Sequence, residues 1–197
     1  MHKAPQLPAS GLASMSPAYF GMVMATGIVS IAADMLGLGR IAQAMFALNV
    51  VLYVLLWALY LLRLARHPRE VFDDLTDHLR GPGYFTVVAA TSVLGSQSLL
   101  LLGNLVLGLA LWCAAVLMWV LFTYAIFTIL TIKENKPSLD RGINGGWLLA
   151  VVATQSVAVL TALLAARIGQ PWKLEMNFFA LSMWLWGGML YIWMMSL

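Results

Sequence analysis

Long stretches without charge dominate the hydrophobic pattern of this chain. Residues 4–33, 41–62, 81–132, 142–166 and 176–197 contain no Asp, Glu, Lys or Arg. One membrane crossing needs about 20 apolar residues, so the longest stretch is long enough for two. Inside hydrocarbon the backbone must satisfy its own hydrogen bonds, and runs of this length do so as helices. The pattern predicts an all-α, polytopic membrane protein.

Six transmembrane helices follow from these stretches, over residues 17–36, 41–62, 82–102, 105–132, 147–166 and 176–197. The turns at 37–39 and 103–104 are too short to hold a domain, so we expect helical hairpins. Residues 1–16 are expected to be a cytoplasmic N-terminal segment that precedes a transmembrane transporter or channel domain over 17–197. The linker at 63–81 has apolar residues at helical spacing with acidic residues on other faces, which predicts a short helix on the inner membrane surface.

An internal repeat relates the odd-numbered helices. The first begins PAYFGMVMAT at Pro17 and the third begins PGYFTVVAAT at Pro82, so six of ten residues coincide at a shift of 65. The fifth helix keeps part of the pattern at a further shift of 63, where Thr154 falls on Thr91. Successive hairpins then enter the membrane from the same side. This pattern is typical of parallel repeats about an axis along the membrane normal.

The two helices of each hairpin differ in side-chain size. The odd helices are rich in Gly, Ala, Ser and Thr, whereas the even helices carry most of the Trp, Tyr and Phe. Small residues allow helices to approach closely. Large rings pack against lipid and sit at its interfaces. We therefore expect the odd helices to form an inner ring around a conduit and the even helices to surround them.

Composition and charge support a membrane location. The chain is 62% hydrophobic and 10% charged, whereas a soluble domain is about 25% charged. Eight Lys and Arg residues fall on the side that holds the N-terminus and three on the other. The positive-inside rule then places the N-terminus in the cytoplasm and the protein in the cell membrane. The net charge of +3 reflects this bias, so we expect no nucleic-acid partner.

Candidate chemistry for catalysis is lacking in the predicted spans. Asp34, at the outer end of the first span, is the only acidic residue near a span, and His2, His67 and His78 lie outside the spans. The sequence contains no glycine loop for nucleotides and no nucleophile with a base and an orienting group. We expect no enzyme activity, no cofactor and no metal site. The single Cys113 lies in the fourth span and cannot form a disulfide within one chain.

Weakly polar residues remain as candidates for the wall of a conduit. Six of them lie on the presumed inner helices: Thr26, Ser30, Thr91, Gln97, Thr154 and Gln155. Hydroxyl and amide dipoles without fixed charge would bind anions weakly and allow rapid release. The alternative is that these residues hold helices together by hydrogen bonds. A second alternative, at the level of function, is a membrane interaction subunit that transports nothing.

The segment YFGMVMATGIVS, from Tyr19 to Ser30, resembles the first-helix signature of the tellurite-resistance/C4-dicarboxylate transporters, which are related to the plant slow anion channels. GPGYFTVVA from Gly81 is similar to their third-helix start, and GWLLAVV from Gly146 to their fifth. The resemblance runs from about Pro17 to the end of the chain.

This resemblance implies passage of small anions such as chloride, nitrate, dicarboxylates, sulfite or tellurium oxyanions. It implies an inner ring from five hairpins, with small pore-lining residues at Gly21 and Ala25, and we add Phe85 to the lining candidates. Family members have about ten helices, whereas this chain has six and lacks the ninth helix, which carries the gate. We therefore expect a truncated sequence, whose partners are the lipid bilayer and small anions. A second copy of the chain, or an inactive fragment of such a transporter, is left open.

Overall fold

The structure is a computed structural model that describes residues 11–132 and 144–196. The described residues form helices and contain no strand. Six helices are long and apolar enough to cross a membrane, which confirms the predicted all-α, multi-pass fold. The elements are η1 (Gly11–Ser14), η2 (Pro17–Phe20), α1 (Gly21–Met35), α2 (Gly39–Arg66), α3 (Pro68–Thr76), η3 (Gly81–Tyr84), α4 (Phe85–Leu101), α5 (Leu105–Ile132), η4 (Gly145–Trp147), α7 (Leu148–Ala165) and α8 (Trp172–Ser196).

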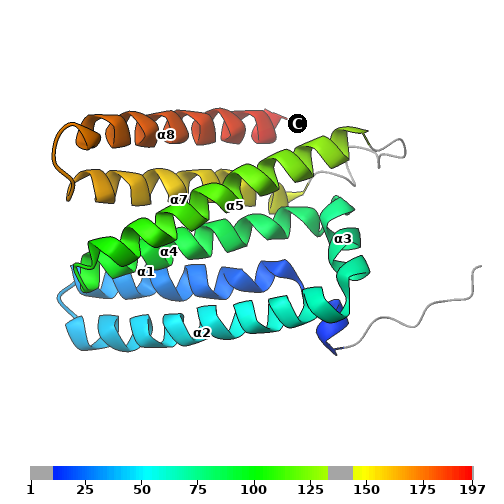
Figure 1. Ribbon diagram of the computed structural model, residues 1–197, viewed down its shortest axis with the longest axis horizontal. Helices are drawn as coiled ribbons and strands as arrows, with labels where there is room; N and C mark the ends of the chain where they lie inside the picture. Colours follow the sequence, from blue (N-terminus) through cyan, green and yellow to red (C-terminus); the bar gives the residue numbers. More distant parts are fainter. Residues whose placement is uncertain (1–10, 133–143, 197) are drawn as a thin grey trace, which may run out of the picture.

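Three antiparallel hairpins, α1–α2, α4–α5 and α7–α8, build the molecule (Figure 1). Their turns lie together at one end, while α3 lies at the other. Gly37 and Gly103 turn the first two hairpins with φ of 76° and 63°. A side chain at these left-handed positions would be strained, which is why glycine suits such tight helix ends.

The first helix of each hairpin, α1, α4 or α7, corresponds to an inner helix of the sequence prediction. Each of the three begins with a short 3₁₀ turn at the same end of the bundle. These turns start at Pro17, Gly81 and Gly145, and η2 contacts η3, which contacts η4. Each start lies 64 residues after the one before, within one residue of the shifts of 65 and 63 found in the sequence. Proline fits there because the first turn of a helix leaves its N–H groups unpaired in any case. The structure therefore carries the sequence repeat into three dimensions, with parallel inner helices.

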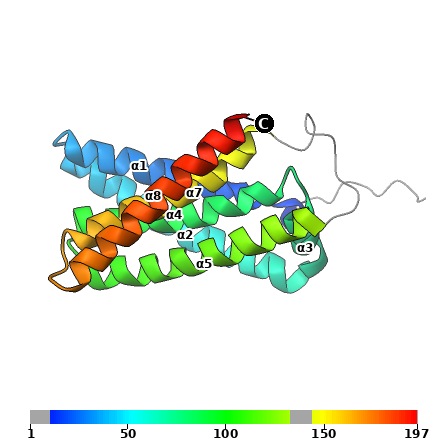
Figure 2. The same ribbon diagram turned by 90° about the horizontal axis from the view of Figure 1, so that it is seen from above.

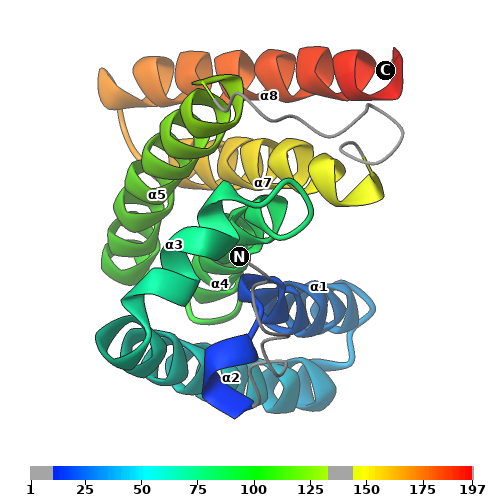
Figure 3. The same cartoon turned by 90° about the vertical axis from the view of Figure 1, so that its right-hand side faces the viewer.

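Burial sets α4 and α7 apart from the other four spans. We compare the share of residues that are buried in the most apolar 18-residue stretch of each span. This share is 89% for α4 with its 3₁₀ turn and 61% for α7 with its turn, against 17% for α2 and 11% for α5. Helix α4 packs between α1 and α7, so it has neighbours on every side (Figure 3). Helix α1 stands at the edge of this row and is only 28% buried. Figure 2 shows α8 lying along the outside of α7.

Two boundaries differ from the sequence prediction. Helix α2 continues to Arg66, four residues past the expected end, and Arg63 in this added turn is buried and bonded to Asp74 of α3. Helix α8 begins at Trp172 rather than at 176. The predicted linker helix is present as α3, which lies against α2, α5 and η3. The basic residues Lys3, Lys133, Lys136 and Arg141 lie outside the described residues.

Candidate functional site: a groove between the inner helices

A groove of about 460 Å³ runs between α1, α4 and α7. All three inner helices contribute to its wall. The lining residues are Met24, Ile28 and Ile31 of α1; Val93, Ser96 and Leu100 of α4; and Val151, Val152, Gln155, Ser156, Val159 and Leu163 of α7. The wall is mainly apolar, with two serines and one glutamine, and contains no charged side chain.

Two positions of the repeat line the groove on all three inner helices. With the shifts of 65 and 63, Ile28 corresponds to Val93 and to Ser156, and all three line the groove. Likewise Ile31 corresponds to Ser96 and Val159. The three inner helices therefore turn equivalent faces toward one shared space. This is the arrangement that a wall around a common axis requires.

Of the nine lining candidates from the sequence, Gln155 lies in the groove wall, where its amide nitrogen also donates to the Trp184 carbonyl at 3.1 Å. Ala25 is exposed, and Gly21 and Thr26 are half-buried on α1. The remaining five are buried inside the helix bundle: Ser30, Phe85, Thr91, Gln97 and Thr154. Whether any of the nine contacts an anion stays a prediction. The sequence repeat could have pointed to the groove residues, because Ile28, Val93 and Ser156 each lie two positions after a repeated threonine.

The buried threonines hold neighbouring hairpins together. Thr154 of α7 lies 2.9 Å from the indole nitrogen of Trp119 on α5. Two turns along the same helix pair, Thr161 lies 2.8 Å from the indole nitrogen of Trp112. Thr91 of α4 lies 2.9 Å from the hydroxyl of Tyr53 on α2. In each case an outer helix of one hairpin bonds to the inner helix of the next.

A buried amide pair lies at the meeting point of α1, α2 and α4. Asn49 Nδ2 donates to Gln97 Oε1 at 2.6 Å, and both side chains are fully buried. Asn49 Oδ1 and Gln97 Nε2 have no hydrogen-bond partner. Gly27 makes room for this pair, because a Cβ there would lie 2.9 Å from Asn49 Nδ2. Ser30, one turn further along α1, donates to the Ala42 carbonyl at 2.8 Å and closes the first hairpin.

A charged cluster ties the linker end together. Arg63 is fully buried near the end of α2, and its Nη2 donates to Asp74 Oδ2 of α3 at 2.7 Å. Arg80 donates to the other carboxylate oxygen of Asp74 at 2.7 Å. Both arginines also bond to carbonyls of the N-terminal segment, Arg63 to Ala13 and Arg80 to Ser14. Asp74 thus links α3 to Arg63 of α2 and to Arg80 before η3, and the two arginines link this cluster to η1.

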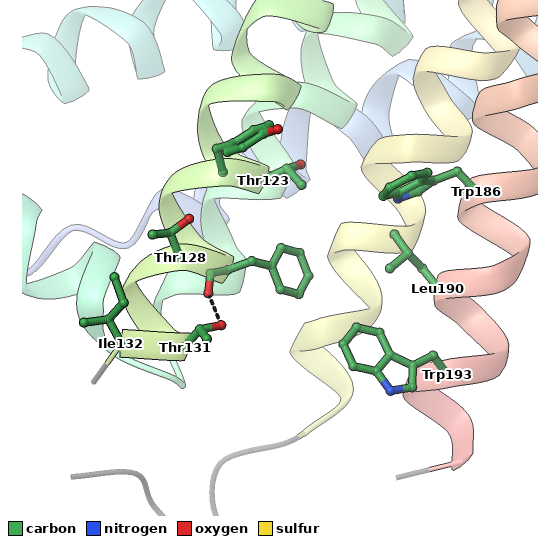
Figure 4. A pocket seen from close by; sticks show the side chains of 9 residues that line it. Thr123, Thr128, Thr131, Ile132, Trp186, Leu190 and Trp193 are labelled. Carbon is green, nitrogen blue, oxygen red and sulfur yellow. Dashed lines mark hydrogen bonds between the residues drawn. The ribbon is translucent and has the colours of Figure 1, made fainter. Parts of the chain in front are cut away.

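A second groove, also of about 460 Å³, lies between the outer helices α5 and α8 (Figure 4). Trp186, Leu190 and Trp193 form one wall, while Thr123, Thr128 and Thr131 lie on the other. The hydroxyl of Thr131 turns back to the Phe127 carbonyl at 2.6 Å. Only residues of the outer helices α5 and α8 line this second groove, and none of them lines the groove between α1, α4 and α7.

Among residues 11–132 and 144–196, no group of three His, Cys, Asp or Glu is placed to hold a metal ion. Cys113 is free and exposed on the outer helix α5.

Comparisons with known proteins point in one direction. Residues 14–197 match the family model described as SLAC1, voltage-dependent anion channel. An uncharacterized transporter of Methanocaldococcus jannaschii is 24% identical over 168 residues, which cover 83% of this chain and 48% of that protein. The chain therefore spans about half the length of this curated relative. No solved structure matches the chain.

Proposed function

Because the chain belongs to the SLAC1 family of voltage-dependent anion channels, we propose that it forms part of a path by which small anions cross a membrane. The match agrees with the resemblance found in the helix-start motifs. The chain is a multi-pass membrane protein. The groove between α1, α4 and α7 is the part of the chain that we assign to the path.

One observation carries this assignment: equivalent repeat positions of all three inner helices line a single space. Packing alone requires inner helices to meet each other, but it does not require them to leave a common groove. The wall offers the hydroxyls of Ser96 and Ser156 and the amide of Gln155, without any fixed charge. Such dipoles bind an anion weakly, so the anion can leave as readily as it enters.

In this proposal the buried Thr91 and Thr154 do not line the path but hold the inner helices in place, since their side chains bond to outer helices. The groove is open on one side, so a closed path needs further helices. These come from a longer chain, in keeping with the length of the relative, or from a second copy. We also propose that the linker end faces the cytoplasm of a cell membrane, because the sequence predicts eight of the eleven Lys and Arg residues on that side.

Anion flux in liposomes tests the proposal. The protein reconstituted in a form that closes the groove, either the longer chain or an assembly of copies, is expected to release chloride or nitrate faster than protein-free liposomes, with malate and sulfite measured in parallel. Val159→Trp should slow the release by about tenfold, because Val159 lies in the groove wall and a large ring would narrow it. Val54→Trp is the matched control, since Val54 is exposed on the outer helix α2.

The opposite results are informative. If Val159→Trp releases anions at the same rate as the parent protein, the groove is not part of the path. Absence of flux with all four anions would favour the alternative of a membrane subunit that transports nothing.

A further inference from the structure

Among the described residues, the hydrogen bonds between side chains of neighbouring hairpins share one pattern. Side-chain bonds join an outer helix to the inner helix of the next hairpin at four places: Asn49–Gln97, Tyr53–Thr91, Trp112–Thr161 and Trp119–Thr154. The last two lie seven residues apart on both helices. Since α5 and α7 run in opposite directions, two turns of helix separate the bonds on each side.

Each threonine in these bonds is fixed in orientation. Thr154 donates its one hydroxyl proton to the Ala150 carbonyl at 2.8 Å, and Thr161 donates to Val157 at 2.7 Å. An indole N–H can only donate, so it points at the remaining lone pair of the threonine. Thr91 likewise donates to the Val87 carbonyl at 2.8 Å. Tyr53 must therefore be the donor in its bond with Thr91.

These bonds determine which face of an inner helix meets the groove. Thr91 and Val93 are two residues apart on α4, and so are Thr154 and Ser156 on α7. Two residues correspond to a rotation of about 200° around an α-helix. Pinning the threonine to an outer helix therefore turns the residue two positions later in the opposite direction, toward the groove. Both of these residues are in fact groove residues.

We infer that Trp119 and Tyr53 are positioning residues that fix the rotation of α7 and α4 and thereby the shape of the groove. The expected effect on anion selectivity rests on the proposed function. The effect on helix rotation does not, and it can be tested separately. An aromatic donor suits the role because a large ring reaches from the outer helix across the interface and carries a single N–H or O–H at its edge.

Trp119→Phe tests the inference, since it keeps a ring beside Trp186 while removing the donor. The first measurement is the rate at which N-ethylmaleimide labels Ser156→Cys, in a Cys113→Ala background, in detergent solution. A change of about threefold is expected from losing one interhelical hydrogen bond in a membrane protein. Thr154→Val should cause a similar change, and Thr154→Ser, which keeps the hydroxyl, should restore the original rate.

Trp184→Phe is the matched control, because the Trp184 side chain is exposed on α8 and the same change there should leave the rate unaltered. The second measurement is the nitrate-to-chloride permeability ratio in liposomes, which Trp119→Phe should shift. A lower melting temperature with an unchanged labelling rate would overturn the inference, because Trp119 would then stabilise the helix packing without fixing the rotation of α7. A changed labelling rate without anion flux in any variant, the parent included, would support the positioning role and count against the proposed function.

Discussion

Arg63 and Asp74 form an ion pair of 2.7 Å in which the arginine side chain is fully buried. The two residues come from α2 and α3, and the same carboxylate also holds Arg80. A carboxylate that pairs with a fully buried arginine is costly to lose, because the buried guanidinium then has no counter-charge. The pair therefore stabilises the linker end, where the first two hairpins meet.

Asp74→Ala should lower the free energy of unfolding by about 3–5 kcal/mol, as expected for breaking a buried ion pair. The midpoint of thermal unfolding in detergent measures this loss. Asp73→Ala is the control, since Asp73 is exposed on the same helix. Equal midpoints for the two variants would contradict the structural role of the cluster.

Gly27→Ala should also destabilise the protein. An added Cβ would clash with Val93 Cγ1 and lie 3.1 Å from Gln97 Oε1, so α1 and α4 would have to separate. Overpacking of this kind costs about 1–3 kcal/mol. Gly21→Ala offers a comparison, because no atom lies within 4 Å of a Cβ built there. If both alanines were tolerated equally, the close approach of α1 and α4 at Gly27 would be refuted.

The buried pair of Asn49 and Gln97 predicts that a second substitution restores the stability lost through the first. Asn49→Leu alone leaves the buried Gln97 without its hydrogen bond, which should cost about 1–3 kcal/mol. Adding Gln97→Met removes the stranded amide, and stability should recover, because replacing both partners by apolar groups is nearly neutral. Unfolding midpoints of the four proteins in this cycle measure the effect. A double variant as unstable as the sum of both single variants would count against the pair.

Membrane orientation can be tested with single cysteines in the Cys113→Ala background. Asp73→Cys lies on α3 at the linker end, and Leu102→Cys lies beside the turn of the second hairpin. Both positions are exposed. A maleimide that cannot cross membranes should label Leu102→Cys on intact cells and reach Asp73→Cys only after lysis. The reverse labelling pattern would invert the proposed topology.

Patterns of hydrophobicity and charge were sufficient to predict the spans. The uncharged stretches gave six helices, and glycines at 37 and 103 marked two of the turns. Comparison of Pro17 with Pro82 revealed the repeat, which reappears as equivalent 3₁₀ turns and equivalent groove faces. These features are local or periodic, so the lipid solvent and backbone geometry dictate them directly.

The rotation of each inner helix was beyond the reach of the sequence. Thr91 and Thr154 recur at one repeat position, and a recurring hydroxyl can face either a conduit or a neighbouring helix with the same period. Only the packed structure places them against Tyr53 and Trp119, and only it turns Val93 and Ser156 toward the groove. The ion pair of Arg63 with Asp74 was equally hidden, since it depends on where α3 docks.

The sequence by itself thus determined the class of protein, the number of crossings and the pairing of helices into repeated hairpins. The tertiary structure decided which side chains meet between hairpins and which face the groove. The physical reason is that hydrophobic burial in a membrane acts on whole helices and leaves their rotation nearly free. A few hydrogen bonds between helices then fix that rotation.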